Sequence, residues 1–208
     1  MQGVEAEEAK VGALASPSRP SGHLLIAARY LCLTALLVGV VGLAGRWLAW
    51  PLLTSTVGPT AYLFATHPRT EPARLRNAAI GHAVAVGLGL GAFVLFGLEH
   101  HPSVSRAGMP SWRQVLASAA AVGVTMSVLE LLHSHHAPAA ATALLITTGL
   151  AKPGSPLIGL VVGLALVVTL GPLCARWPLS PRDRRLTTTG WSEGATTGPP
   201  LTAGAPRR

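Results

Sequence analysis

Long apolar stretches separated by short polar segments dominate the pattern of hydrophobic and polar positions along the chain. Four stretches are close to the roughly 20 residues that a membrane-spanning helix needs, and each holds mostly Leu, Val, Ala and Gly with almost no charge. They are residues 24–45, 78–98, 112–132 and 157–175. The pattern therefore predicts an all-α fold, a polytopic transmembrane helix bundle.

Two shorter apolar segments lie between these spans. Residues 47–66 are interrupted by Pro51 and by Gly58-Pro59, and residues 137–151 are short and opened by Pro138. A helix broken at membrane depth exposes backbone groups that a cavity or a ligand must satisfy. The repeated order of full span, Pro-interrupted segment and full span predicts two similar halves, with a binding site where the broken segments meet. The alternative is that Pro and Gly are simply tolerated here, as in many membrane helices.

The distribution of Lys and Arg predicts the orientation. If both interrupted segments cross the membrane, only four of the 16 basic residues lie on the side opposite the termini, namely Arg46, Arg106, Arg113 and Lys152. If both segments are re-entrant, four spans remain and the side of the termini still holds the majority. Both arrangements place the two termini in the cytoplasm, at the inner (plasma) membrane. Six crossings are favoured, because they keep Arg69, Arg74 and Arg76 inside and make the halves an inverted repeat.

Composition agrees with a membrane protein and limits the other classes. Only 12% of the 208 residues are charged, about half the share that soluble domains carry. The formal net charge is +8, but the basic residues form no continuous face, which argues against a nucleic-acid partner. Residues 1–22 and 177–208 lack apolar periodicity and are predicted to be disordered cytoplasmic tails. Residues 23–176 are the predicted transmembrane domain.

The chain has 8 histidines, several of them inside or beside apolar segments. An imidazole in hydrocarbon is a candidate functional group, because burying it is costly and it titrates near neutral pH. His82 lies deepest within a continuous apolar run. The alternative is a histidine at a helix end that donates to a neighbouring carbonyl.

A second group of histidines suggests a different chemistry. His133, His135 and His136 lie beside Glu130, and imidazole and carboxylate are ligands of zinc or nickel. No second cluster of ligands accompanies them, so we predict neither a metal site nor a cofactor. The sequence also lacks a GxSxG elbow, an HExxH motif and a P-loop, so we do not expect an enzyme.

The two proline turns predict an anion site. Proline suits the first position of a helix, and the free N–H groups of such a helix start attract anions. A helix of fourteen residues from Pro138 rises about 21 Å, less than the roughly 30 Å of the hydrocarbon core, so its start would lie below the membrane surface. Thr60 and Thr142 would add hydroxyl donors.

Three stretches together resemble the HPP family of integral membrane proteins, named for a His-Pro-Pro motif. They are residues 57–64, the run from Arg76-Asn77 to Gly81-His82, and the run that begins His136-Ala137-Pro138. The resemblance covers residues 24–175, and Ala137 stands where the family has its first proline. It implies about four spans and a small-anion transporter, and the association of plant plastid and cyanobacterial relatives with nitrite transport suggests nitrite as the substrate.

These observations together predict a transporter that moves a small anion through a site between the two broken helices. The two prolines would set the helix starts, the nearby N–H groups and threonines would bind the anion, the histidines would supply charge or a proton, and an Arg-Asn pair would form the cytoplasmic mouth. The predicted site comprises Gly58, Pro59, Thr60, Arg76, Asn77, His82, His136, Pro138 and Thr142.

Two other functions fit the same sequence. One is a non-transporting membrane component that binds a partner or lipid through its basic loops, and the other is a membrane metal-binding protein that uses the His cluster. The expected partners of the transporter are the small anion, the lipid bilayer and other copies of the chain in a homo-oligomer.

Overall fold

A computed structural model describes residues 20–175, and the chain divides into two compact units. The first unit comprises residues 1–29 and 178–208, of which only residues 20–29, the start of helix α2 (Pro20–Leu48), are described. Most of the two predicted disordered tails therefore lies outside the described residues. The second unit, Tyr30–Trp177, contains the rest of α2 and every other described element, and the following description concerns this unit.

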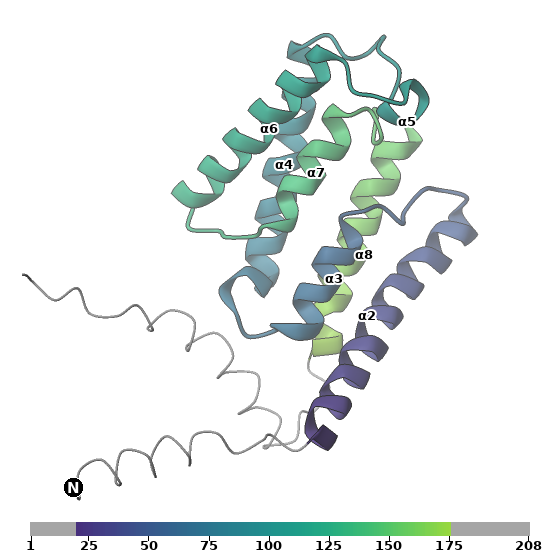
Figure 1. Ribbon diagram of the computed structural model, residues 1–208, viewed down its shortest axis with the longest axis vertical. Helices are drawn as coiled ribbons and strands as arrows, with labels where there is room; N and C mark the ends of the chain where they lie inside the picture. The colour runs from purple at the N-terminus through teal and green to yellow at the C-terminus, as the bar shows by residue number, and fades with distance from the viewer. Residues whose placement is uncertain (1–19, 176–208) are drawn as a thin grey trace, which may run out of the picture. The chain divides into compact units, whose positions relative to one another are not determined.

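The described elements of the second unit are all helical (Figure 1). After α2 come α3 (Val57–Thr66), the 3-10 helix η1 (Glu71–Ala73), α4 (Leu75–Leu95), α5 (Val104–Ala107), α6 (Trp112–Leu131), α7 (Pro138–Thr147) and α8 (Ser155–Ala175). Helices α2, α4, α6 and α8 are long and apolar enough to cross a membrane. They coincide with the four predicted spans to within a few residues, which confirms the predicted polytopic helical bundle.

The outer surface of these helices suits a hydrocarbon environment. Large apolar side chains point outward along them, with Leu43 and Val94 both 63% exposed. Trp47 and Trp112, close to the ends of α2 and α6, are 88% and 83% exposed, as is typical of aromatic side chains at the membrane–water interface. The molecule is a membrane protein, and its outward-facing leucines and valines form a surface suited to lipid.

Each short helix packs in parallel on a long helix of the other half. Gly81 of α4 faces His136, and Gly89, two turns further along α4, faces Ile146 of α7. A Cβ atom at Gly81 would lie 2.9 Å from the Cβ of His136. Small residues of this kind let backbones approach closely inside membranes, so these two glycines determine how near α7 lies to α4.

The same contact recurs in the other half. Gly163 of α8 faces the backbone of Leu52, and Gly171 faces the ring of Phe64 in α3. Both glycines of α8 follow the corresponding glycines of α4 by 82 residues. Figure 1 shows α4 and α8 running in opposite directions, as do α3 and α7. The two halves are therefore similar and inverted relative to each other, as the sequence predicts.

The chain passes through the bundle at both interrupted segments. In Figure 1 the segment that contains α3 leads from the end of α2 to the start of α4, at the other end of the bundle, and α7 connects α6 to α8 in the same way. This path corresponds to the crossing arrangement and not to the re-entrant one.

Helix α7 is shorter than the sequence predicts. It ends at Thr147, although the apolar pattern continues to Ala151. Gly149 adopts the left-handed conformation with φ 75°, the N–H of Leu150 donates to the carbonyl of Leu145 (3.0 Å), and the N–H of Gly149 donates to that of Ile146 (3.0 Å). This glycine-terminated pattern is a Schellman motif, and it limits α7 to a rise of about 15 Å.

Helix α3 also begins differently from the prediction. Its first residue is Val57, so Pro59 is the third residue and does not occupy the first position. The preceding chain, residues 49–56, is not helical and satisfies its backbone locally. The N–H of Leu52 donates to the carbonyl of Trp50 (2.9 Å), and that of Thr54 donates to the carbonyl of Leu52 (3.0 Å).

The glycine contacts lead to a stability prediction. A Cβ atom at Gly89 would lie 3.3 Å from the Cα of Ala143, whereas no atom lies within 4 Å of the same position at Gly91. We expect Gly89→Ala to lower the free energy of unfolding by about 1–3 kcal/mol through overpacking, and Gly91→Ala to leave it nearly unchanged. Thermal unfolding in detergent would measure both variants. Equal stability of the two would show that α7 is not held by this close contact.

Candidate functional site

Four of the predicted site residues converge at the junction of the two short helices. Thr60 lies on α3, His82 on α4 and Thr142 on α7, while His136 lies just before α7. The two threonines are completely buried, and the two histidines are 5% and 2% exposed. Residues far apart in the sequence thus form one buried polar cluster inside a largely apolar bundle.

His82 is the centre of this cluster. Its Nδ1 atom lies 2.9 Å from the Oγ1 of Thr142, and its Nε2 atom lies 3.1 Å from the Nε2 of His136 and 3.3 Å from the Oγ1 of Thr60. The two imidazole rings meet edge to face, with their centroids 4.7 Å apart. The Nδ1 atom of His136 lies 2.9 Å from the carbonyl oxygen of Pro72.

The acceptor at Pro72 fixes the positions of the protons. A carbonyl only accepts, so Nδ1 of His136 carries a proton, and in the neutral ring Nε2 must then accept. His82 therefore donates from Nε2 to His136, and its Nδ1 accepts from the hydroxyl of Thr142. The hydroxyl of Thr60 donates to the carbonyl of Thr56 (2.8 Å). The N–H at Nε2 of His82 is bifurcated, and its second acceptor is the hydroxyl oxygen of Thr60. With both rings neutral, the donors form one chain that runs from Thr142 to Pro72.

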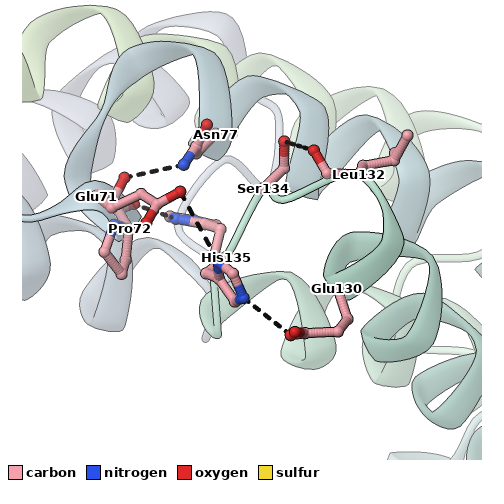
Figure 2. A network of polar contacts seen from close by, with 8 residues as sticks. Glu71, Pro72, Asn77, Glu130, Leu132, Ser134 and His135 are labelled. Atoms are coloured by element: carbon pink, nitrogen blue, oxygen red, sulfur yellow. Dashed lines mark hydrogen bonds and ion pairs between the residues drawn. The ribbon is translucent and has the colours of Figure 1, made fainter.

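Two surface loops hold His136 in place. Figure 2 shows the loop that contains Pro72 lying beside the loop between α6 and α7. The side chain of Asn77 donates to the carbonyl of Glu71 (3.1 Å), and His135 lies between two carboxylates, 2.8 Å from Glu130 and 3.8 Å from Glu71. These contacts are exposed and contribute little to stability, but the one between His135 and Glu71 joins the two halves.

The geometry of His135 bears on the metal alternative. Its Nε2 atom faces Glu130 and its Nδ1 atom faces Glu71, so the two carboxylates lie at different nitrogens of the ring (Figure 2). The three groups therefore do not converge on one point, as metal ligands would. Within the described part of the chain, no group of three or more His, Cys, Asp or Glu side chains is arranged to hold a metal ion.

The predicted free N–H groups at the start of α7 are not free. Pro138 is the first residue of α7, as predicted. However, the N–H of Ala139 donates to the carbonyl of His136 (3.0 Å), and that of Ala140 donates to the carbonyl of Ala137 (3.1 Å). Ala137 has helical dihedral angles (φ −53°, ψ −35°), so a tight turn forms ahead of the proline and uses these donors. The predicted backbone cradle for an anion is therefore wrong at α7.

The remaining predicted residues lie apart from the cluster or support it indirectly. Gly58 is half-buried, whereas Pro59 and Arg76 are exposed. Asn77 is buried, but its amide holds the backbone of Glu71. Asn77 of α4 therefore helps to hold the segment that contains Pro72. Pro59 and Arg76 lie outside the buried cluster.

An apolar groove adjoins His82 at the interface between the halves. It has a volume of about 700 Å³ and is lined by α4 and α8. Apart from Leu75, each lining residue of α4 has a counterpart 82 positions later in α8, so the groove lies on the axis that relates the halves. The paired positions are Ala79 and Val161, His82 and Leu164, Ala83 and Ala165, Val86 and Val168, and Gly87 and Thr169.

Three features of the site were missed from the sequence. The role of the Pro72 carbonyl as the acceptor for His136 was missed because every residue has a backbone carbonyl, so the sequence does not distinguish this one. The groove was missed because the packing of α4 against α8 cannot be read from either helix alone. The position of Gly81 directly before His82 could have indicated a role at the site. That role, leaving room for His136, is visible only in the packed structure.

Comparison with known proteins agrees with the architecture. Residues 19–182 match the family model described as HPP, transmembrane region, and this range covers most of the chain. No curated protein and no solved structure gives a significant match.

The hydrogen-bond chain predicts the tautomer of each buried histidine. At neutral pH we expect His82 to carry its proton on Nε2 and His136 on Nδ1, which nitrogen-15 NMR of histidine-labelled protein distinguishes. Thr142→Val should change the signals of His82 and leave the tautomer of His136 unchanged, because the carbonyl of Pro72 still fixes it. The exposed His100 lies outside the cluster and serves as the reference signal. A proton on Nε2 of His136 in the neutral protein would contradict the chain.

Proposed function

The chain belongs to the HPP family of integral membrane proteins, and we propose that it carries a small anion across the membrane through the cluster of Thr60, His82, His136 and Thr142. The observation that carries this proposal is a buried polar cluster in which side chains from both interrupted segments contact His82 of α4. Polar groups inside a membrane bundle are costly to bury, and they commonly line substrate pathways. In transporters with inverted repeats, substrates bind where discontinuous helices from the two halves meet.

The cluster offers hydroxyl and imidazole donors to the anion. The hydroxyls of Thr60 and Thr142 contact different nitrogens of the His82 ring, so they lie on two sides of it. The hydroxyl of Thr60 would have to release the carbonyl of Thr56 to donate to an anion, and an anion with two oxygen atoms, such as nitrite or formate, then has an acceptor for each side. Nitrite is the substrate that the family resemblance favours, and this arrangement of donors is compatible with it.

The inverted halves suggest how the site opens to each side. One short helix packs on α4 and the other on α8, through glycine contacts at equivalent positions. Because the halves are alike, exchanging their local arrangements would open the opposite side of the bundle. The anion would then remain near His82 while access changes from one side to the other.

A second candidate is a non-transporting membrane component. The observation that favours it is that each ring nitrogen of His82 and His136 already has a partner within the protein. In that case the cluster would only connect α3, α4 and α7, and its loss would destabilise the bundle. Uptake and stability measured on the same variants separate the two functions.

Anion uptake by proteoliposomes tests the proposal, with nitrite, nitrate, formate and chloride compared. We expect His82→Ala and His136→Ala each to lower the initial uptake rate about tenfold or more, because a hydrogen bond to a charged group contributes about 1.5–3 kcal/mol. His100→Ala, which alters an exposed histidine, is the matched control and should transport normally. Thermal stability in detergent is measured on every variant.

The outcomes of this experiment differ clearly. Loss of uptake with retained stability supports the anion site. Normal uptake in both variants would rule out the cluster as the site, and uptake lost together with stability would favour the structural component. If no anion is taken up by the unaltered protein, the transport function itself is wrong.

We also propose that both termini face the cytoplasm and that the protein resides in the inner (plasma) membrane. The support is the distribution of basic residues, because only Arg46, Arg106, Arg113 and Lys152 lie on the other side of a six-crossing chain. A reporter that is active only in the cytoplasm should be active when fused after Arg208. An active fusion of a periplasmic reporter at the same position would reverse the orientation.

A further inference from the structure

The anion site contains no permanent positive charge. Its side chains are two threonines and two histidines, all buried, and Arg76 is exposed outside the cluster. A bare anion in such surroundings lacks a counter-charge, and burying an unpaired charge is costly. Any positive charge at the site must therefore come from a proton on an imidazole.

The hydrogen-bond chain accepts one proton without moving any heavy atom. The added proton fits on Nδ1 of His82, because the Oγ1 of Thr142, 2.9 Å away, can accept as well as donate. Nε2 of His82 still donates to His136, and Nδ1 of His136 still donates to Pro72. The pair of rings then carries one positive charge.

A second proton does not fit. The last free acceptor is Nε2 of His136, which faces the Nε2–H of His82 at 3.1 Å. Two N–H groups directed at each other at this distance repel each other, and both rings would be positively charged. The pair therefore takes up a single proton.

Protonation also creates a donor for the anion. In the neutral chain the hydroxyl of Thr142 donates to His82. Once Nδ1 of His82 carries a proton, that hydroxyl accepts from the ring, and its own proton is free to bind another acceptor. Uptake of one proton thus supplies both a positive charge and a hydroxyl donor at the same place.

The groove beside His82 favours passage without net charge. Of its lining residues, only His82 and Thr169 have polar side chains, and none is charged. Apolar walls of this kind make net charge unfavourable near His82, and the pairing of one proton with one monovalent anion removes that charge. A divalent anion would keep one uncompensated charge.

Other titratable groups near the pair are engaged elsewhere. Glu71 of η1 and Glu130 of α6 face His135, with side chains 47% and 73% exposed. His133 is also exposed. The described parts of α3 and α7 contain one titratable side chain, that of the exposed Tyr62, and α8 contains only Cys174. The histidine pair is therefore the group whose protonation would accompany the anion.

We infer that the protein couples each monovalent anion to one proton held by the His82–His136 pair, so that transport is electroneutral. This inference rests on the proposed anion transport and adds its coupling and charge selectivity. It predicts that a pH gradient drives accumulation and that the membrane potential does not. Sulfate, which is divalent, should not be carried.

The test uses proteoliposomes of the full chain with nitrite and nitrate as probes. Nitrate is included because its conjugate acid is too strong to leak across the bilayer, and protein-free liposomes correct for leakage of nitrous acid. A potassium gradient with valinomycin sets the membrane potential, and an internal pH dye records proton entry. We expect about tenfold accumulation for each unit of inward acid gradient, no dependence on potential, and one proton for each anion.

One variant separates coupling from folding. His82→Gln keeps a donor for His136 and an acceptor for Thr142 but removes the nitrogen that takes the proton, so proton entry with the anion should be lost while the stability in detergent is kept. His100→Ala is again the control. If His82→Gln does not fold, His82→Asn is measured in its place.

The outcomes separate this inference from the proposed function. A change of about 50-fold in accumulation per 100 mV, which is expected if one net charge moves, would overturn the coupling while transport stands. Unchanged proton entry in a folded His82→Gln protein, or transport of sulfate, would also overturn it. Absence of any uptake by the unaltered protein would overturn the proposed function and the coupling together.

Discussion

The structure depends on the close approach of two interrupted segments to the long helices α4 and α8. Backbone groups at membrane depth must be satisfied within the protein, so neither segment can face lipid along its whole length. Glycines in α4 and α8 remove the side chains that would keep the segments away. Gly81 shows the consequence for the site, because its neighbour His82 is brought within hydrogen-bond distance of His136 by the same contact.

The direction of the buried hydrogen-bond chain is set at its surface end. The carbonyl of Pro72 accepts from His136, and this single acceptor decides the tautomers of both rings. Pro72 belongs to the loop before α4, whereas His136 belongs to the loop before α7, so one half fixes the protonation pattern of the other. A movement between these loops would change the proton positions around His82 without altering any residue inside the bundle.

The two halves share their packing and one threonine of the cluster, because Thr142 follows Thr60 by 82 positions, but they do not share the histidines. The glycines of α4 and α8 and the residues that line the groove follow the same spacing of 82 positions, yet Leu164 stands where the first half has His82. The repeat therefore gives both halves the same packing. Because Leu164 occupies the position equivalent to His82, only the first half has a histidine there. Other buried polar side chains, such as those of Gln114 and Thr147, bond backbone carbonyls, because each buried polar group needs its own partners.

The sequence by itself determined the membrane class, the four spans, the two interrupted segments, the duplicated order and the HPP family. These properties follow from apolar runs, prolines and local motifs, which need no knowledge of distant contacts. It also selected Thr60, His82, His136 and Thr142, because polar residues in apolar segments are conspicuous. Only the tertiary structure decided that these four meet while Pro59 and Arg76 do not, that α7 ends at Thr147, and that its first N–H groups are engaged. Each of these depends on how one turn closes or which helix packs beside another, and such contacts join residues that the linear pattern leaves apart.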